Sequence, residues 1–148
     1  MEIPPSLTSD LQARLAHVLQ AHGGWIGFDQ FMELALYTPG LGYYARDSGQ
    51  IGQQPARRGA HGGSDFVTAP TLSPLFGRTL ALQVAQALQM TQTHALWEFG
   101  AGTGAMAAQL LQALGDQVDQ YTIVDLSGTL RARQRETLAA FADKVRWV

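Results

Sequence analysis

Hydrophobic residues in the first half of the chain recur mainly at helical spacing. Leucine and valine positions from Leu7 to Leu19 predict a first helix, and the pattern from Phe28 to Ala35 predicts a second. The apolar stretch Leu41–Tyr44, which follows Pro39-Gly40, is expected to be extended. These first residues therefore indicate a helical segment.

A longer helix is predicted to begin at Ser73-Pro74. A serine side chain can accept a hydrogen bond from the first helical amides, and proline suits the first helical position, where no amide hydrogen is needed. Gly77 lies inside this helix at a propensity cost of about 1 kcal/mol, which predicts close packing against a neighbouring element.

The last third of the chain alternates between apolar runs and helical patterns. The runs Ala95–Phe99, Tyr121–Val124 and Lys144–Val148 predict strands, with one helix ending at Gly115 between the first two. Strands separated by helices are typical of parallel sheets. The predicted fold class is therefore α/β: a helical N-terminal segment followed by the first βαβαβ part of a Rossmann-like sheet, expected to be incomplete.

We accordingly predict two parts, a helical segment over residues 1–92 and a Rossmann-like segment over residues 93–148. Residues 46–64 are rich in glycine and glutamine and show no periodicity. Such a stretch buries too little apolar surface to offset its ordering entropy. We therefore expect a mobile loop there.

Composition narrows the class of protein. The 148 residues fit one ordinary domain, and the net charge of −2 gives no reason to expect a nucleic acid or an anionic membrane as partner. No cysteine is present, which excludes disulfides and thiolate metal sites. No apolar run approaches the roughly 20 residues of a membrane span, and the N-terminal residues lack the pattern of a signal peptide. We expect a cytoplasmic protein.

The chemistry is concentrated where the first predicted strand ends. Gly100, Gly102 and Gly104 follow it directly, and Asp125 ends the next strand. Glycines let a ligand approach the backbone, and a helix that starts there offers unpaired amides and a partial positive charge. A carboxylate at the same edge of the sheet suits the hydroxyls of a ribose. This pattern predicts an adenosine-containing cofactor.

Two cofactor classes fit the spacing. Gly100-x-Gly102-x-x-Ala105, with Asp125 further on, satisfies a dinucleotide fingerprint, so an NAD-type oxidoreductase stays open. Glu98 precedes the glycines and would repel a pyrophosphate, whereas the sulfonium and ammonium groups of S-adenosylmethionine would be attracted. The third interpretation is a βα turn without a ligand. The charge of Glu98 favours S-adenosylmethionine.

Four segments occur in a characteristic order: Pro39-Gly-Leu-Gly-Tyr-Tyr44, Ser64-Asp-Phe-Val-Thr-Ala-Pro70, Leu75-Phe-Gly77 and Glu98-Phe-Gly-Ala-Gly-Thr-Gly104. Together they resemble the N-terminal part of the MidA-like family of class I S-adenosylmethionine-dependent methyltransferases. The family usually has glycine where this chain has Ser64. The resemblance implies these cofactor-binding residues: Thr68, Pro70, Glu98, Gly100, Ala101, Gly102, Gly104, Asp125 and Leu126. For Thr68 and Pro70, an ordinary helix-entry turn is the alternative.

The same resemblance implies methyl transfer to a protein, on arginine, with S-adenosylhomocysteine as product. No metal is expected, because methyl transfer from a sulfonium relies on positioning and electrostatics. No catalytic residue is assigned. A non-catalytic assembly or scaffold protein that keeps the fold is the main alternative function.

Family members are several hundred residues long, and the class I sheet places its first strand centrally. With three strands, Ala95–Phe99 would form a free apolar edge. We therefore expect that the chain is a fragment, inactive alone, or that a second chain completes the sheet.

Overall fold

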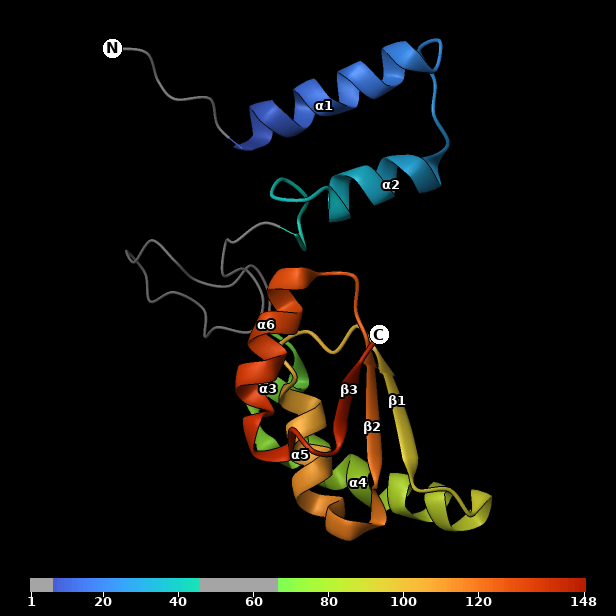
Figure 1. Cartoon of the computed structure of the whole chain (residues 1–148), viewed down its shortest axis with the longest axis vertical. Helices are drawn as coiled ribbons and strands as arrows, with labels where there is room; N and C mark the ends of the chain where they lie inside the picture. Colours follow the sequence, from blue (N-terminus) through green and yellow to red (C-terminus); the bar gives the residue numbers. More distant parts are fainter. Residues whose placement is uncertain (1–6, 46–66) are drawn as a thin grey trace, which may run out of the picture. The chain divides into compact units, whose positions relative to one another are not determined.

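The computed structural model describes residues 7–45 and 67–148 (Figure 1). The predicted mobile loop 46–64, and with it Ser64, lies outside the described residues. Contacts divide the chain into two compact units, Met1–Asp47 and Ser48–Val148. The second unit therefore begins well before residue 93, where the Rossmann-like segment was predicted to start.

None of the helices in the described parts of the chain is both long and apolar enough to cross a membrane.

The first unit contains the two predicted helices, α1 (Leu7–Ala21) and α2 (Phe28–Tyr37). Helix α1 ends at a glycine pair, where the Gly24 amide donates to the Leu19 carbonyl at 2.7 Å. Gly24 has a φ of 90°, a left-handed conformation that glycine adopts without steric cost. The first predicted helix therefore ends at these glycines.

The prediction that Leu41–Tyr44 is extended is wrong. This stretch forms turns, with the Tyr43 amide donating to the Ala35 carbonyl at 3.0 Å and the Tyr44 amide donating to the Leu36 carbonyl at 2.8 Å. The segment folds back because the last carbonyls of α2 need partners beyond the helix. The spacing of the aromatic residues in the sequence does not indicate that these carbonyls will bind the following segment.

The second unit is a three-stranded parallel sheet in the order β1-β2-β3, with helices between successive strands. Its elements are α3 (Ala69–Leu72), α4 (Pro74–Thr91), β1 (Ala95–Phe99), α5 (Ala105–Leu114), β2 (Gln120–Val124), α6 (Gly128–Thr137) and β3 (Val145–Trp147). Short 3₁₀ turns, Gly115–Gln117 and Ala139–Phe141, follow α5 and α6. The predicted α/β class and the alternation of strands and helices are confirmed.

The register of the sheet places the carboxyl ends of β1 and β2 side by side. Phe99 is paired with Val124, and the ladder continues as the Gly100 amide donates to the Val124 carbonyl at 2.9 Å. Since the two strands are parallel, the glycine turn after β1 and Asp125 after β2 emerge at the same edge. This edge is the predicted ligand position.

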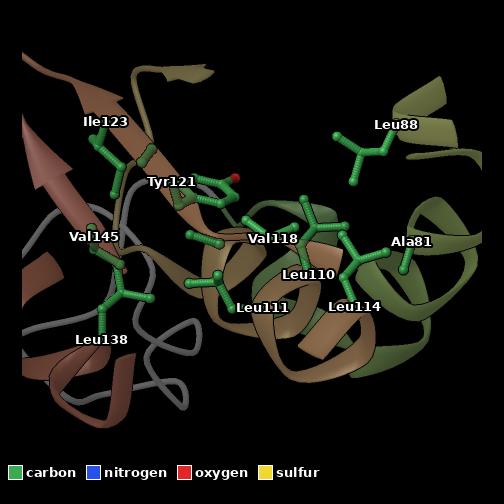
Figure 2. Packing of buried hydrophobic residues seen from close by; sticks show 12 residues of the cluster. Ala81, Leu88, Leu110, Leu111, Leu114, Val118, Tyr121, Ile123, Leu138 and Val145 are labelled. Atoms are coloured by element: carbon green, nitrogen blue, oxygen red, sulfur yellow. The ribbon is translucent and has the colours of Figure 1, made fainter. Parts of the chain in front are cut away.

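One face of the sheet carries the hydrophobic core of this unit (Figure 2). Tyr121 and Ile123 of β2 are fully buried and lie with residues from α5. The core consists of Ala81, Leu88, Ala101, Ala107, Leu110, Leu111, Leu114, Val118, Tyr121, Ile123, Leu138 and Val145. Helices α4 and α5 thus cover the sheet through these side chains.

The opposite face of β1 is open to solvent. Trp97 is 60% exposed and Phe99 is 74% exposed, and their rings stack with centroids 6.5 Å apart. Both alternate along β1 with Leu96 and Glu98, which are half-buried on the other face. Within the described residues, β1 therefore has both a free edge and an uncovered aromatic face.

Helix α4 begins as predicted, because the Ser73 hydroxyl accepts a hydrogen bond from the Leu75 amide at 3.1 Å. Gln109 of α5 forms hydrogen bonds that hold this end of α4 against α5. The Gln109 amide oxygen accepts from the Gly77 amide at 2.9 Å, and its nitrogen donates to the Pro70 carbonyl at 2.7 Å. The close packing predicted for Gly77 is confirmed, since a methyl group there would overlap Gln109.

The substitution Gly77→Ala is expected to lower the free energy of unfolding by about 1–3 kcal/mol, because overpacking at Gln109 outweighs the gain in helix propensity. Gly128→Ala in the first turn of α6 is the matched control, since a methyl group there meets open space. It should be neutral or stabilising by up to about 1 kcal/mol. Urea denaturation measures both; a neutral Gly77→Ala would contradict the packing.

Candidate cofactor site at the carboxyl edge of the sheet

The turn after β1 depends on backbone conformations that favour glycine. Gly100, Gly102 and Gly104 have φ angles of 69°, 56° and 81°. A methyl group on Gly100 would meet no atom within 4 Å, so the space above this residue is open. On Gly104 it would meet Leu138 at 3.4 Å, so this glycine also serves the packing of α5 against the segment after α6. The turn is both a tight connection and an accessible surface.

Helix α5 begins immediately after this turn. Its N-cap is Gly104, which has no side chain to occupy the first-turn amides. These amides and the helix dipole give the start of α5 a partial positive charge that faces the open side of the turn. The arrangement suits oxygen-rich or anionic groups.

Asp125 lies directly beyond β2 and is 8% exposed. Its carboxylate accepts one hydrogen bond on each oxygen: from the Ser127 amide at 2.9 Å and from the Gln134 side-chain nitrogen at 2.7 Å. Each carboxylate oxygen can accept a second bond. Asp125 is thus held in one orientation and keeps acceptor capacity for ligand hydroxyls.

Gln134 of α6 is the residue that the sequence reasoning missed. Its side chain is fully buried, and it connects Asp125 with the Gly102 carbonyl at 3.0 Å and the Trp147 indole at 3.0 Å. A signal was present in the sequence, because Gln134 falls midway between Leu130 and Leu138 at helical spacing and so lies on the same helix face as these two leucines. A polar residue on a buried stripe requires partners.

Glu98 faces the helix-covered side of the sheet and accepts a hydrogen bond from the Tyr121 hydroxyl at 2.8 Å. Burial raises the pKa of this carboxyl above its ordinary value of 4.5; the Tyr121 hydrogen bond lowers it, and repulsion by Asp125 raises it again. Burial also raises the pKa of Tyr121, so its hydroxyl keeps its proton. A cation bound nearby would lower the free-energy cost of ionising the buried Glu98 carboxyl.

The other predicted residues occupy two places. Ala101 is buried within the turn, whereas Leu126, beside Asp125, is 76% exposed and presents an apolar side chain at the edge. Thr68 is the N-cap residue of α3, and the Pro70 carbonyl is bound by α5 through Gln109. The helix-entry alternative for Thr68 and Pro70 is therefore observed, and contact of either residue with a cofactor stays a prediction.

Comparisons with known proteins agree with this geometry. Residues 79–148 match a family model described as "Putative S-adenosyl-L-methionine-dependent methyltransferase". The chain is 28% identical over 146 residues to the mitochondrial protein arginine methyltransferase NDUFAF7 homolog of Caenorhabditis elegans. That alignment covers 95% of this chain and 33% of the relative.

Two solved structures from Burkholderia thailandensis are similar along the whole chain. One, solved with S-adenosyl-homocysteine bound, has 48% identity and a TM-score of 0.83, and the chain covers 40% of it. The other, a native structure of an uncharacterized protein, has 46% identity and a TM-score of 0.75, with 38% coverage. The chain thus spans well under half the length of these relatives.

The substitution Tyr121→Phe is expected to raise the pKa of Glu98 further, because it removes the hydrogen bond that stabilises the carboxylate. A folded-state pKa above the unfolded value means that stability falls as the pH rises from 4.5 through the folded pKa. The variant should extend this fall to higher pH and lose about 1–3 kcal/mol at neutral pH.

A carboxyl NMR titration, combined with denaturation between pH 4 and 8, measures both effects. Tyr37→Phe in the first unit is the control and should leave the Glu98 titration unchanged. An unchanged or lowered Glu98 pKa in Tyr121→Phe would refute the assigned hydrogen bond.

Proposed function

Because the chain belongs to the MidA-like family of S-adenosylmethionine-dependent methyltransferases, we propose that it forms the cofactor-binding portion of a methyltransferase that acts on a protein. The observation that carries the proposal is the shared edge, where an open glycine turn and the oriented Asp125 lie at the ends of paired strands. The similar structure solved with S-adenosyl-homocysteine and the name of the Caenorhabditis elegans relative support it. By that resemblance, we propose arginine as the acceptor.

The residues present fit such a cofactor. Open space above Gly100 admits a ligand against the backbone, and Asp125 would accept hydrogen bonds from the ribose hydroxyls. Leu126 is an exposed apolar residue at the same edge and would contact the adenine. Glu98 would attract the positively charged methionine portion, and binding of that charge would favour its ionised form. When bound, S-adenosylmethionine supplies an activated methyl group.

We further propose that additional polypeptide covers the free side of β1. The exposed Trp97 and Phe99 rings and the unpaired edge form an apolar surface that a complete sheet would bury. The relatives are more than twice as long as this chain, so the proposed occupant is their remaining portion, supplied by following sequence or by a second chain. Methyl transfer would then require that portion.

Calorimetry is expected to detect binding of S-adenosylhomocysteine and no binding of NAD. Asp125→Asn should weaken the binding by about 1–3 kcal/mol, because the ribose hydroxyls lose a charged acceptor. Asp119→Ala, at the opposite end of the same strand, should leave affinity unchanged. Binding of NAD instead would replace the methyltransferase proposal with an oxidoreductase.

Binding of S-adenosylhomocysteine by the longer polypeptide, with no transfer of labelled methyl groups to any protein in a cell extract, would favour the scaffold alternative.

A size measurement of the 148-residue chain should show association or aggregation at micromolar concentration. Trp97→Lys should shift the population towards monomer, because a charge on the uncovered face opposes its burial. Met90→Lys is the control, since Met90 is also an exposed apolar residue, 86% exposed, but belongs to α4 and not to β1. A well-folded wild-type monomer would contradict the proposed covering of β1.

A further inference from the structure

Gln134 connects three segments that are distant in sequence. Its side-chain nitrogen donates to Asp125 Oδ2 at 2.7 Å and to the Gly102 carbonyl at 3.0 Å, and its oxygen accepts from Trp147 Nε1 at 3.0 Å. Gly102 belongs to the glycine turn, Asp125 follows β2 and Trp147 lies in β3. One fully buried amide therefore links the two halves of the candidate cofactor site to the next strand.

These contacts fix the orientation of the amide. Its nitrogen has two hydrogens and faces two oxygens that only accept, while its oxygen faces an indole group that only donates. The reversed amide would place oxygen against the Asp125 carboxylate and a donor against the Trp147 indole. No other rotation about the terminal bond satisfies all three partners, and none of the buried side-chain polar atoms in the described residues lacks a partner.

Asp125 is consequently held from two sides. The Ser127 amide binds Oδ1, and Gln134 binds Oδ2, so the plane of the carboxylate is set before any ligand arrives. The same Gln134 nitrogen also binds the Gly102 carbonyl, and it thereby fixes the position of the glycine turn relative to Asp125. Acceptors oriented in advance bind hydroxyls without a further ordering cost.

The contact with β3 prevents Gln134 from turning away. The Trp147 ring is half-buried and carries the Arg135 guanidinium 5.1 Å from its centroid. The indole is thus held by its neighbour on α6 while its nitrogen donates to Gln134. Because Trp147 of β3 fixes the terminal amide of Gln134, that amide also keeps the Asp125 carboxylate in place.

We propose that Gln134 is a positioning residue that sets Asp125 and the glycine turn for recognition of the ribose hydroxyls. The inference rests on the proposed cofactor site and names the residue that gives the site its selectivity for ribose. Removing the Gln134 side chain should therefore reduce the difference in affinity between ligands with and without ribose hydroxyls. This effect should be separate from any loss of folding stability.

The test compares S-adenosylhomocysteine with its 2′,3′-dideoxy counterpart by calorimetry. Wild type should prefer the natural ligand about 10- to 100-fold, the range expected for hydrogen bonds to a charged group. Gln134→Met fills a similar volume without donors, and its preference should fall at least about fivefold. If Gln134→Met does not fold, Gln134→Asn takes its place, because it shortens the side chain by one methylene and disturbs the fold less. Its preference for the natural ligand should also be lower than that of wild type.

Leu88→Ala is the control for stability alone, because Leu88 belongs to the buried core on α4, whereas the hydrogen-bond partners of Gln134 are Gly102, Asp125 and Trp147. Its preference for the natural ligand should match that of wild type. Wild-type discrimination retained in folded Gln134 variants would overturn the positioning role. A wild type that binds neither ligand would instead refute the proposed cofactor site, so the two failures are distinguishable.

Discussion

The parallel pairing of β1 with β2 is the constraint on which the site depends. The register joins Phe99 to Val124, so the residues that follow, Gly100 and Asp125, leave the sheet side by side. A shift by one residue would turn the side chains of β2 to the opposite face and remove Tyr121 and Ile123 from the core. Core packing and site geometry therefore select the same register, and the hydrophobic effect that buries β2 also positions the carboxylate.

The polar groups inside this unit follow from the same register. Glu98 lies on the core side of β1, where Tyr121 of β2 donates to it, and Asp125 is satisfied by Ser127 and Gln134. A buried carboxylate without such partners would cost several kcal/mol. Two acidic residues can therefore lie near one turn because neighbouring strands and α6 supply donors. When both are ionised, these carboxylates would attract a cationic group of a ligand and repel a pyrophosphate, while the start of α5 offers amides to oxygen-rich groups.

Much of this fold could be predicted from local signals. β1 has the predicted bounds, Ser73 caps α4, and Gly77 marks the close approach to α5, because apolar runs, caps and helix glycines act over a few residues. The turn at Leu41–Tyr44 could not be predicted, since it forms to satisfy carbonyls of α2.

Gln109 and Gln134 were missed for a related reason. Both glutamines bind backbone or side-chain groups more than eight residues away, and such partners are defined only once the helices pack. The acidic residue and the glycines of the site were predicted because strand ends and tight turns leave direct traces in sequence. The side chains that orient them do not.

Mapping S-adenosylhomocysteine onto the backbone amides by ¹H–¹⁵N NMR tests the central claim most directly. The account predicts that the largest shifts occur at Gly100–Gly104, at the first turn of α5 and at Asp125–Ser127, the segments that meet at the carboxyl edge of the sheet. Saturable shifts confined to other segments, such as α1 and α2, would contradict it.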